Sequence, residues 1–337
     1  MKTNLLPIRL FHAPARHYTD LSPRQIDAIG YFNAQLKAGD FLFESVPCLC
    51  GSDNFDLVAS VDRYSFHQQT VLCRDCGLIL SNPRLDTLSC EKFYQTDLYR
   101  MVYDDSDLAT LSKAEHFESR VGMQARQVFD TVSKFRKIDE RTRVLDLGAG
   151  GGWNLVPFIK AGAEVSGLDY SPALVEIGRR HGIAMQQGGL NDIAGMYDVI
   201  ILNHVLEHFR EPIAALRVIN DSLREEGLIY IGVPDIRNFS MGQLQNAHNY
   251  YFTPRTLIHY CALSGLQPLL SGPESGIHMF AVFSKVCDCA APSLDGHYEE
   301  MLAKFNFLLY RETIRSLLDD ANLYRPLRKL YAYFRNR

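Results

Sequence analysis

The sequence lacks a long apolar run, a strong net charge and an uninterrupted apolar segment near its start. No run approaches the ~20 apolar residues that a membrane helix needs, so we expect no membrane span. A formal net charge of −4 provides no overall basic field, which argues against nucleic acid as the main partner. Pro7, Pro14 and two arginines interrupt the first residues, unlike a secretory signal peptide. We therefore expect a cytoplasmic chain.

Internal repeats and low-complexity tracts are also missing, and the composition is that of an ordinary globular protein. At 337 residues the chain is long enough for about two domains. Changes of pattern divide it into five segments. They are a helical N-terminal arm (1–44), a cysteine-bearing module (45–90), a helical connector (91–140), a domain of alternating strands and helices (141–286) and a helical C-terminal segment (287–337).

Two stretches carry clear helix signals. The stretch "SPRQIDAIGYFNAQLKAG" begins with a serine cap and a proline in its first turn, and it ends at Gly39. In "AEHFESRVGMQARQVFDTVSKF", apolar residues recur at helical spacing from Phe117 to Val132. Both stretches are therefore predicted to form amphipathic helices outside the main sheet.

Short apolar runs alternate with helical stretches after Arg143. The runs "RVLDLG", "EVSGLD", "YDVIILN" and "LIYIGVP" are predicted strands, and "HMFAVFSKV" is the predicted last strand. Such alternation is typical of a parallel sheet with helices on both faces. We expect an α/β fold with a doubly wound, mostly parallel, Rossmann-like sheet, a small zinc-ribbon-like module before it and helical flanking segments.

A glycine-rich turn follows the first of these strands in "VLDLGAGGGWN". Glycines at Gly148 and Gly150 let the main chain take positive φ and let a ligand approach closely. A dinucleotide fingerprint would have glycine where Trp153 stands. Asp146 on the strand suits an ammonium better than a pyrophosphate, and Asp169 at the end of the next strand can accept from two ribose hydroxyls. The pattern favours S-adenosylmethionine over NAD.

These motifs, in this order and spacing, resemble class I S-adenosylmethionine-dependent methyltransferases over about residues 141–286. The resemblance implies S-adenosyl-L-methionine as cofactor. It places Asp146, Gly148 and Gly150 at the methionine end, Asp169 at the ribose, Asn191 and Asp192 near the adenine, and Asn203 with His204 beside the methyl group.

Four cysteines form a Cys-x-Cys pair and a Cys-x-x-Cys pair, each followed by glycine. In a reducing compartment such pairs are typical of metal ligands, and four thiolates around Zn²⁺ close the coordination shell. We expect a structural zinc site, with unliganded thiols as the alternative. The surrounding sequence resembles the zinc-binding module that precedes the catalytic domain in some of these methyltransferases, including sugar C-methyltransferases, where it helps to cover the substrate. The four residues are Cys48, Cys50, Cys73 and Cys76.

Methyl transfer to a hydroxyl usually needs a base, and histidine is the natural candidate. In "NHVLEH", His204 and His208 stand four residues apart on a predicted helix, with Glu207 between them. They are candidate bases, although a hydrogen-bonded structural pair is the plainer interpretation. A metal bound by His204, His208 and a carboxylate is a weaker alternative, because the pattern is not His-Glu-x-x-His.

His248 is the remaining candidate base, and we place it first. Its loop, "QNAHNYYFTPRTL", resembles the one that carries Tyr-x-Glu-His in sugar C-methyltransferases. His248 matches the histidine, but Gln245 and Ala247 replace the tyrosine and the glutamate. The replacement favours O-methylation over C-methylation.

The sequence therefore predicts a methyltransferase for a small acceptor, with a sugar, nucleotide-sugar or glycan as the preferred class. Methylation of another natural product, a peptide or RNA is an alternative. A binding protein that keeps the cofactor fold without turnover is a second alternative, which the intact Asp146 and Asp169 argue against.

Overall fold

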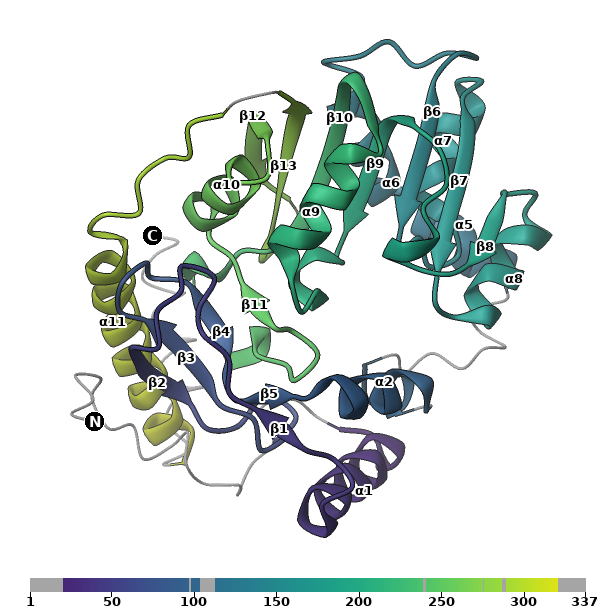
Figure 1. The fold of residues 1–337 in the computed structure, drawn as a ribbon. Helices are drawn as coiled ribbons and strands as arrows, with labels where there is room; N and C mark the ends of the chain where they lie inside the picture. Colours follow the sequence, from purple (N-terminus) through teal and green to yellow (C-terminus); the bar gives the residue numbers. More distant parts are fainter. Residues whose placement is uncertain are drawn as a thin grey trace, which may run out of the picture.

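The structure of the chain is a computed structural model, shown in Figure 1. It describes residues 21–96, 98–103, 113–238, 241–274, 276–286 and 289–320. The first 20 residues of the predicted N-terminal arm and the basic end of the predicted C-terminal helix lie outside the described residues.

A seven-stranded sheet forms the centre of the larger unit, in the order β12-β13-β10-β9-β6-β7-β8. The five strands β6 to β10 pair with one another in parallel, whereas β13 pairs antiparallel with both β10 and β12. The strands are β6 (Arg143–Leu147), β7 (Glu164–Asp169), β8 (Met185–Gln187), β9 (Tyr197–Asn203), β10 (Leu223–Pro234), β12 (Leu266–Pro273) and β13 (His278–Lys285). This confirms the predicted α/β fold with a mostly parallel, Rossmann-like sheet and all five predicted strands.

Strands β8 and β12 lie at the two edges of the sheet and were not predicted. β8 has only three residues, two of them exposed, and β12 alternates between buried and more exposed positions and contains Pro268 and Pro273. Edge strands carry weak apolar signals because one side and often one face meet water.

Helices cover both faces of this sheet. Alternate residues of each strand point to opposite faces, so Val144 enters one apolar core and Leu145 the other. The first core also contains residues of α5 (Ala114–Val121), α6 (Met123–Val132), α7 (Val156–Lys160) and α8 (Pro172–Arg180). The second contains residues of α9 (Pro212–Asp221) and α10 (Pro254–Ala262).

The predicted helix around Phe117 is two helices, α5 and α6, separated at Gly122. The predicted apolar face is correct, because Phe117, Ala125, Val128 and Val132 are buried. The prediction of one continuous helix was wrong. At Gly122 the backbone takes φ −59° and ψ −102°, which lies outside the helical region and therefore ends α5 before α6 begins.

A second, four-stranded antiparallel sheet has the order β11-β4-β3-β2. Three of its strands come from the cysteine module: β2 (Phe55–Ala59), β3 (Thr70–Cys73) and β4 (Ile79–Ser81). The fourth, β11 (Tyr250–Tyr251), comes from the segment between β10 and α10 of the larger unit. In Figure 1, the chain leaves the large sheet to add β11 beside β4. A short ladder of β1 (Phe43–Glu44) and β5 (Arg84–Leu85) borders the module.

The long helix α11 (His297–Asp320) packs on the module, although it is the last described element. Met301 and Phe305 share an apolar cluster with Val58, Leu72 and Tyr251 of the small sheet. Its first residues lie against the second cysteine turn. A Cβ on Gly77 would stand only 2.9 Å from the carbonyl carbon of His297, so only glycine fits there.

The N-terminal helices form a separate aromatic cluster. Helix α1 (Pro23–Ala38) is capped as predicted: Gln25 N donates to Ser22 Oγ at 3.3 Å, and Gly39 ends the helix with φ +81°. Phe32 packs against Phe66 and Phe93, the latter from α2 (Thr87–Gln95). Helix α3 (Leu98–Tyr103) completes the cluster.

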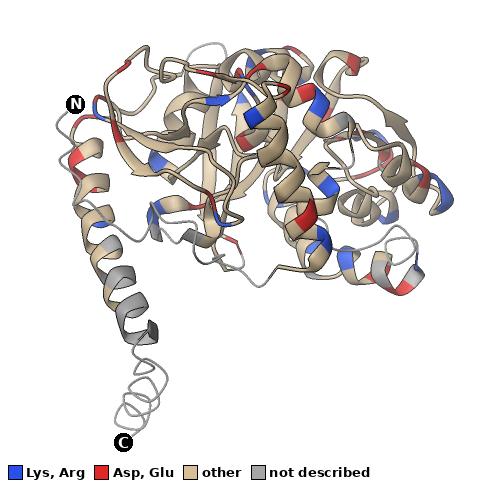
Figure 2. Cartoon of the chain, turned by 90° about the horizontal axis from the view of Figure 1, so that it is seen from below, with Lys and Arg blue, Asp and Glu red and all other residues tan. Residues whose placement is uncertain are grey.

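Charged residues of both signs are interspersed over the described chain, as Figure 2 shows. None of the described helices is both long and apolar enough to cross a membrane.

Packing of α11 should stabilise the small sheet. Phe305 is fully buried, whereas Phe307 on the same helix is 66% exposed. Phe305→Ala should lower the free energy of unfolding by about 3–5 kcal/mol, because it leaves a cavity between helix and sheet. Phe307→Ala, the matched control, should change it by less than about 0.5 kcal/mol. Urea denaturation followed by fluorescence measures both; equal effects would contradict the described packing.

Candidate functional site

The glycine-rich turn lies at the carboxyl end of β6 and needs its glycines. Gly148 and Gly150 have φ +72° and +58°, in the left-handed region. A Cβ on Gly148 would lie 2.5 Å from Val205 Cγ2, and one on Gly150 would lie 2.5 Å from Trp153 Cζ2. The side chains of Val205 and Trp153 therefore pack directly against the turn and leave no room for a Cβ at either glycine.

Asp169, at the end of β7, is tied to this turn. Its Oδ2 accepts from Gly150 N and its Oδ1 from Ser171 N, both at 2.8 Å. Burial raises the pKa of Asp169, and the two N–H donors oppose that rise. Each carboxylate oxygen still has a second lone pair, so this side chain can accept the hydroxyls of a ribose.

Asp146 is fully buried beneath the turn. Asn154 Nδ2 donates to its Oδ2 at 3.2 Å, and its Oδ1 has no hydrogen-bond partner among the described residues. Burial, with a smaller contribution from the charge of Asp169, raises the pKa of Asp146 to about 8. A buried carboxylate with a free oxygen fits a cationic ligand group such as the ammonium of S-adenosylmethionine.

The other predicted cofactor contacts also lie at the carboxyl ends of the strands. Asn191 and Asp192 form the short 3₁₀ turn η3 (Leu190–Asp192) after β8, and both are exposed. Asp192 Oδ2 accepts from Gly189 N at 2.8 Å. Asn203 ends β9, and its Oδ1 is buried without a hydrogen-bond partner in the described chain. Ligand contacts for these residues stay predictions.

The predicted helix over "NHVLEH" is wrong. The segment is a single 3₁₀ turn, η4 (Leu206–His208), because His204 takes φ +59°, which a right-handed helix cannot contain. As a result His204 and His208 do not face each other. The ring of His204 lies 4.6 Å from that of His278, whereas the ring of His208 lies 4.8 Å from that of His248.

His204 lies between two buried carboxylates. Its Nδ1 is 3.6 Å from Glu207 Oε1 and its Nε2 is 3.9 Å from Glu274 Oε2. Burial by itself lowers the pKa of His204, but the two carboxylates outweigh it, and the net pKa is raised. The side chain is 30% exposed, so it is accessible to an acceptor.

His208 and His248 are more enclosed. His208 Nδ1 lies 2.9 Å from Ala247 O, a hydrogen bond that places the proton on Nδ1. His248 is only 4% exposed, and Gln245 contacts its Nε2. Burial lowers the pKa of both imidazoles, that of His248 well below its usual range. Both rings are therefore neutral at pH 7.

Sequence reasoning missed a group of tyrosines beside these histidines. Tyr94, Tyr99 and Tyr103 follow one another with ring centroids 4.9 and 5.0 Å apart. Tyr99 lies 6.4 Å from the ring of His208, and Tyr94 OH is 3.3 Å from its Nδ1. The density of tyrosines in "FYQTDLYRMVY" is a signal that could have suggested an aromatic wall. Glu274 was also missed, because it is isolated in sequence.

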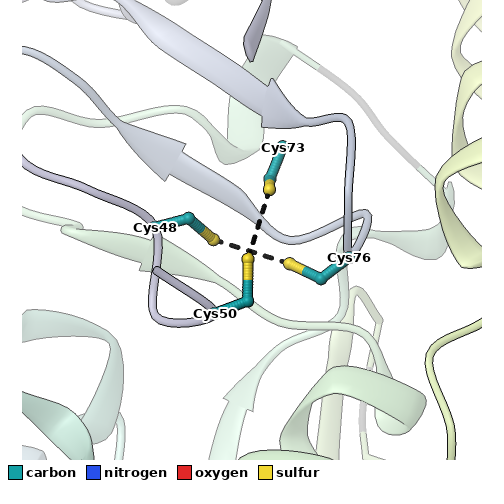
Figure 3. Close-up of side chains that lie close together, drawn as sticks. All are labelled: Cys48, Cys50, Cys73 and Cys76. Atoms are coloured by element: carbon teal, nitrogen blue, oxygen red, sulfur yellow. Dashed lines mark hydrogen bonds between the residues drawn. The ribbon is translucent and has the colours of Figure 1, made fainter. Parts of the chain in front are cut away.

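The four predicted metal ligands come together at one point (Figure 3). Sγ of Cys48 is 3.5 Å from that of Cys76, and Sγ of Cys50 is 3.6 Å from that of Cys73. Sulfurs bound to one tetrahedral Zn²⁺ would be roughly 3.8 Å apart, since each bond is about 2.3 Å long. The donor set therefore fits a structural zinc ion. Tyr260 OH, from α10, donates to Cys76 Sγ at 3.4 Å.

Each cysteine pair stands on a tight turn. Gly51 N donates to Cys48 O at 2.8 Å and Gly77 N to Cys73 O at 2.9 Å, with φ of +88° and +71° at the two glycines. Such turns are the ones that the glycine after each pair predicts.

Comparisons with known proteins agree with this geometry. Residues 120–271 match the family model described as a methyltransferase domain. The chain contains a methyltransferase domain. Most of the Rossmann-like sheet lies within these residues.

Curated relatives include ubiquinone biosynthesis O-methyltransferases. Those of Xanthomonas campestris pv. campestris (strain B100) and Xanthomonas oryzae pv. oryzae (strain PXO99A) are 29% and 30% identical over 99 residues. In both cases the match covers 26% of this chain and 41% of the relative, so the chain spans about two fifths of these relatives.

Solved structures of methyltransferases are similar at low identity. The Burkholderia thailandensis 1,6-didemethyltoxoflavin-N1-methyltransferase with bound 1,6-didemethyltoxoflavin and S-adenosylhomocysteine is 19% identical, with 63% of this chain and 97% of that chain covered and a TM-score of 0.47. An S-adenosylmethionine-dependent methyltransferase from Mesorhizobium loti is 13% identical, with 49% and 100% covered and a TM-score of 0.42.

Cofactor binding should release a proton from Asp146. At pH 7 its carboxyl, with a pKa of about 8, is mostly protonated in the free protein. A cofactor ammonium favours the ionised form, so binding should release about one proton, and less as the pH rises through 8. Calorimetry in two buffers of different ionisation enthalpy measures this. Asp146→Asn should bind more weakly and release none, while the exposed Asp130→Asn should behave like the natural chain. Binding without proton release by the natural chain would contradict the assignment.

Loss of one thiolate should abolish the tetrathiolate site. Cys50→Ser should weaken the thiolate-to-cobalt charge-transfer band of the Co²⁺-loaded chain by about a quarter or more, because one of four sulfur ligands is gone. Binding of S-adenosylhomocysteine should largely survive, since Asp146 and Asp169 belong to the other unit. Cys289→Ser removes a thiol outside the cluster and should leave the band intact. An unchanged band in Cys50→Ser would show that the four sulfurs do not share one ion.

Proposed function

We propose that this chain transfers a methyl group from S-adenosylmethionine to an oxygen of a small acceptor. The observation that carries the proposal is the buried Asp146, which has a free carboxylate oxygen beside a glycine turn that is tied to Asp169. This arrangement suits a ligand that carries both an ammonium group and a ribose, and it lies in a methyltransferase domain.

The cofactor would supply a sulfonium-bound methyl group. Asp146 would hold its ammonium, the main chain at Gly148 and Gly150 would line its methionine end, and Asp169 would accept from its ribose. Asn191 and Asp192 would border the adenine. Asn203, at the end of β9, would lie near the methyl group.

His204 is the favoured base among the three predicted candidates. It directly precedes Val205, whose side chain packs on the Gly148 turn, and its imidazole is 30% exposed. His248, placed first from the sequence, is only 4% exposed and lies beside Glu207 and His208. A base must reach the acceptor proton to within hydrogen-bond distance, and accessibility therefore favours His204.

The acceptor is proposed to be a sugar, nucleotide-sugar or glycan. Tyr94, Tyr99 and Tyr103 supply aromatic rings beside the histidines. Asn246 accepts from Tyr103 OH, and Arg63 lies over Tyr64, whose ring is 5.1 Å from that of Tyr103. Aromatic faces with hydrogen-bonding neighbours suit the apolar faces and hydroxyls of a sugar. The names of the curated relatives, which are O-methyltransferases, support transfer to oxygen rather than carbon.

Turnover on a panel of acceptors tests this proposal. Nucleotide sugars, glycans and a catechol are incubated with the chain and S-adenosylmethionine, and released S-adenosylhomocysteine is measured. We expect turnover with at least one nucleotide sugar or glycan. Turnover only with the catechol would overturn the acceptor class, and failure to bind the cofactor in calorimetry would overturn the methyltransferase proposal itself.

The base has its own test on the acceptor so identified. His204→Gln should lower kcat by about 100-fold or more while cofactor affinity stays unchanged, because only proton removal is lost. His67→Gln, an exposed histidine of the module, is the control and should retain full activity. An undiminished kcat in His204→Gln would exclude His204 as the base.

A further inference from the structure

A buried carboxylate next to the proposed base has no adequate partner. Glu207, in η4, is 1% exposed, and neither of its oxygens accepts a hydrogen bond in the described part of the chain. Burying an ionised carboxylate without hydrogen bonds costs several kcal/mol. A bound cation would remove that cost.

The groups that surround Glu207 are imidazoles. Its Oε1 lies 3.6 Å from His204 Nδ1 and 3.9 Å from His248 Nε2, and no lysine or arginine of the described residues forms an ion pair with it. The distances exceed those of hydrogen bonds, so these contacts leave the oxygens open. One potential ligand atom each from Glu207, His208 and His248 lies within 4.8 Å of the others.

Of the two histidines, His208 is oriented as metal ligands usually are. His208 Nδ1–H donates to Ala247 O, which leaves Nε2 with a lone pair. His248 Nδ1 is buried and has no hydrogen-bond partner in the described chain, whereas its Nε2 is contacted by the side chain of Gln245, which would have to turn away for Nε2 to bind an ion.

Backbone contacts hold the three side chains together. Asn249 N donates to Glu207 O at 2.9 Å and Asn249 Nδ2 to His208 O at 2.7 Å. Ser81 Oγ, at the end of β4, donates to His248 O at 2.7 Å. The two segments that carry the ligands are therefore positioned by the small sheet before any ion arrives.

We propose that Glu207, His208 and His248 bind one divalent transition-metal ion, separate from the tetrathiolate site. Two imidazoles and one carboxylate are the ligand set of open sites for Zn²⁺ and Fe²⁺, whereas Mg²⁺ and Ca²⁺ prefer oxygen ligands. Three protein ligands leave at least one coordination position free.

The free position would take the acceptor hydroxyl. A metal-bound hydroxyl loses its proton more readily, and His204, 3.6 Å from Glu207, is placed to receive it. This role rests on the proposed methyl transfer, whereas metal binding itself does not.

Metal stoichiometry of the full chain tests the proposal. The chain is stripped of metal, loaded with excess Co²⁺, freed of unbound ion and analysed by elemental analysis and absorption. We expect about two cobalt ions per chain, one with the thiolate charge-transfer band and one without it. Glu207→Gln should hold about one, with the thiolate band intact. Glu274→Gln, a neighbouring buried carboxylate outside the ligand set, is the matched control and should keep about two.

The proposal would be overturned if the natural chain held only one cobalt ion with the thiolate band complete. It would also be overturned if Glu207→Gln bound as many cobalt ions per chain as the natural chain. Should Glu207→Gln fail to fold, proton NMR of the Co²⁺-loaded natural chain decides. A hyperfine-shifted, exchangeable imidazole N–H signal, expected from His208 Nδ1–H, supports the site, and its absence overturns it. Cofactor calorimetry on the same samples reports on the methyltransferase proposal separately.

Discussion

The pairing of β11 with β4 is the contact on which the rest of the site depends. Tyr250 pairs with Leu80 and Tyr251 with Ile79, so a strand from the methyltransferase domain completes the sheet of the cysteine module. The loop that precedes β11 carries His248 and Asn249, and the pairing presses it against η4. Together with the hydrogen bonds of Asn249 to Glu207 O and His208 O, this two-residue ladder fixes His248 relative to Glu207 and His208.

The cysteine module also packs against the larger unit through its apolar core. Leu78 and Leu80 share an apolar core with Leu145 and Leu147 of β6, and this core also contains Cys73. Tyr260 of α10 reaches Cys76 Sγ. A zinc ion that holds the two cysteine turns would thereby stabilise β3 and β4, and through them the wall that β11 and its loop form at the candidate site.

Buried carboxylates that form no ion pair with a lysine or arginine of the described residues define the chemistry of this molecule. Asp146 and Glu207 are each at most 1% exposed, and both have oxygens that accept no hydrogen bond from the described residues. Buried charges in proteins are normally paired or bound to metal. The two sites therefore suit two different cations: the ammonium of a cofactor at Asp146 and, in our proposal, a metal ion at Glu207. Glu274, with one free oxygen beside His204, adds negative charge to the same side of the sheet.

The sequence by itself determined the features that depend on local order. The strands β6, β7, β9, β10 and β13, the glycine turn at Gly148, the capped helix α1 and the pairing of cysteines into two turns all follow from patterns within a few residues. Tertiary structure alone decided that β11 joins the module, that α11 covers it, and that His208 meets His248 instead of His204. These are contacts between segments tens to hundreds of residues apart, and their physical basis is strand pairing and apolar burial, which no local pattern specifies. The left-handed φ of His204 belongs with them, because packing of Val205 on the Gly148 turn, rather than helix propensity, sets the backbone there.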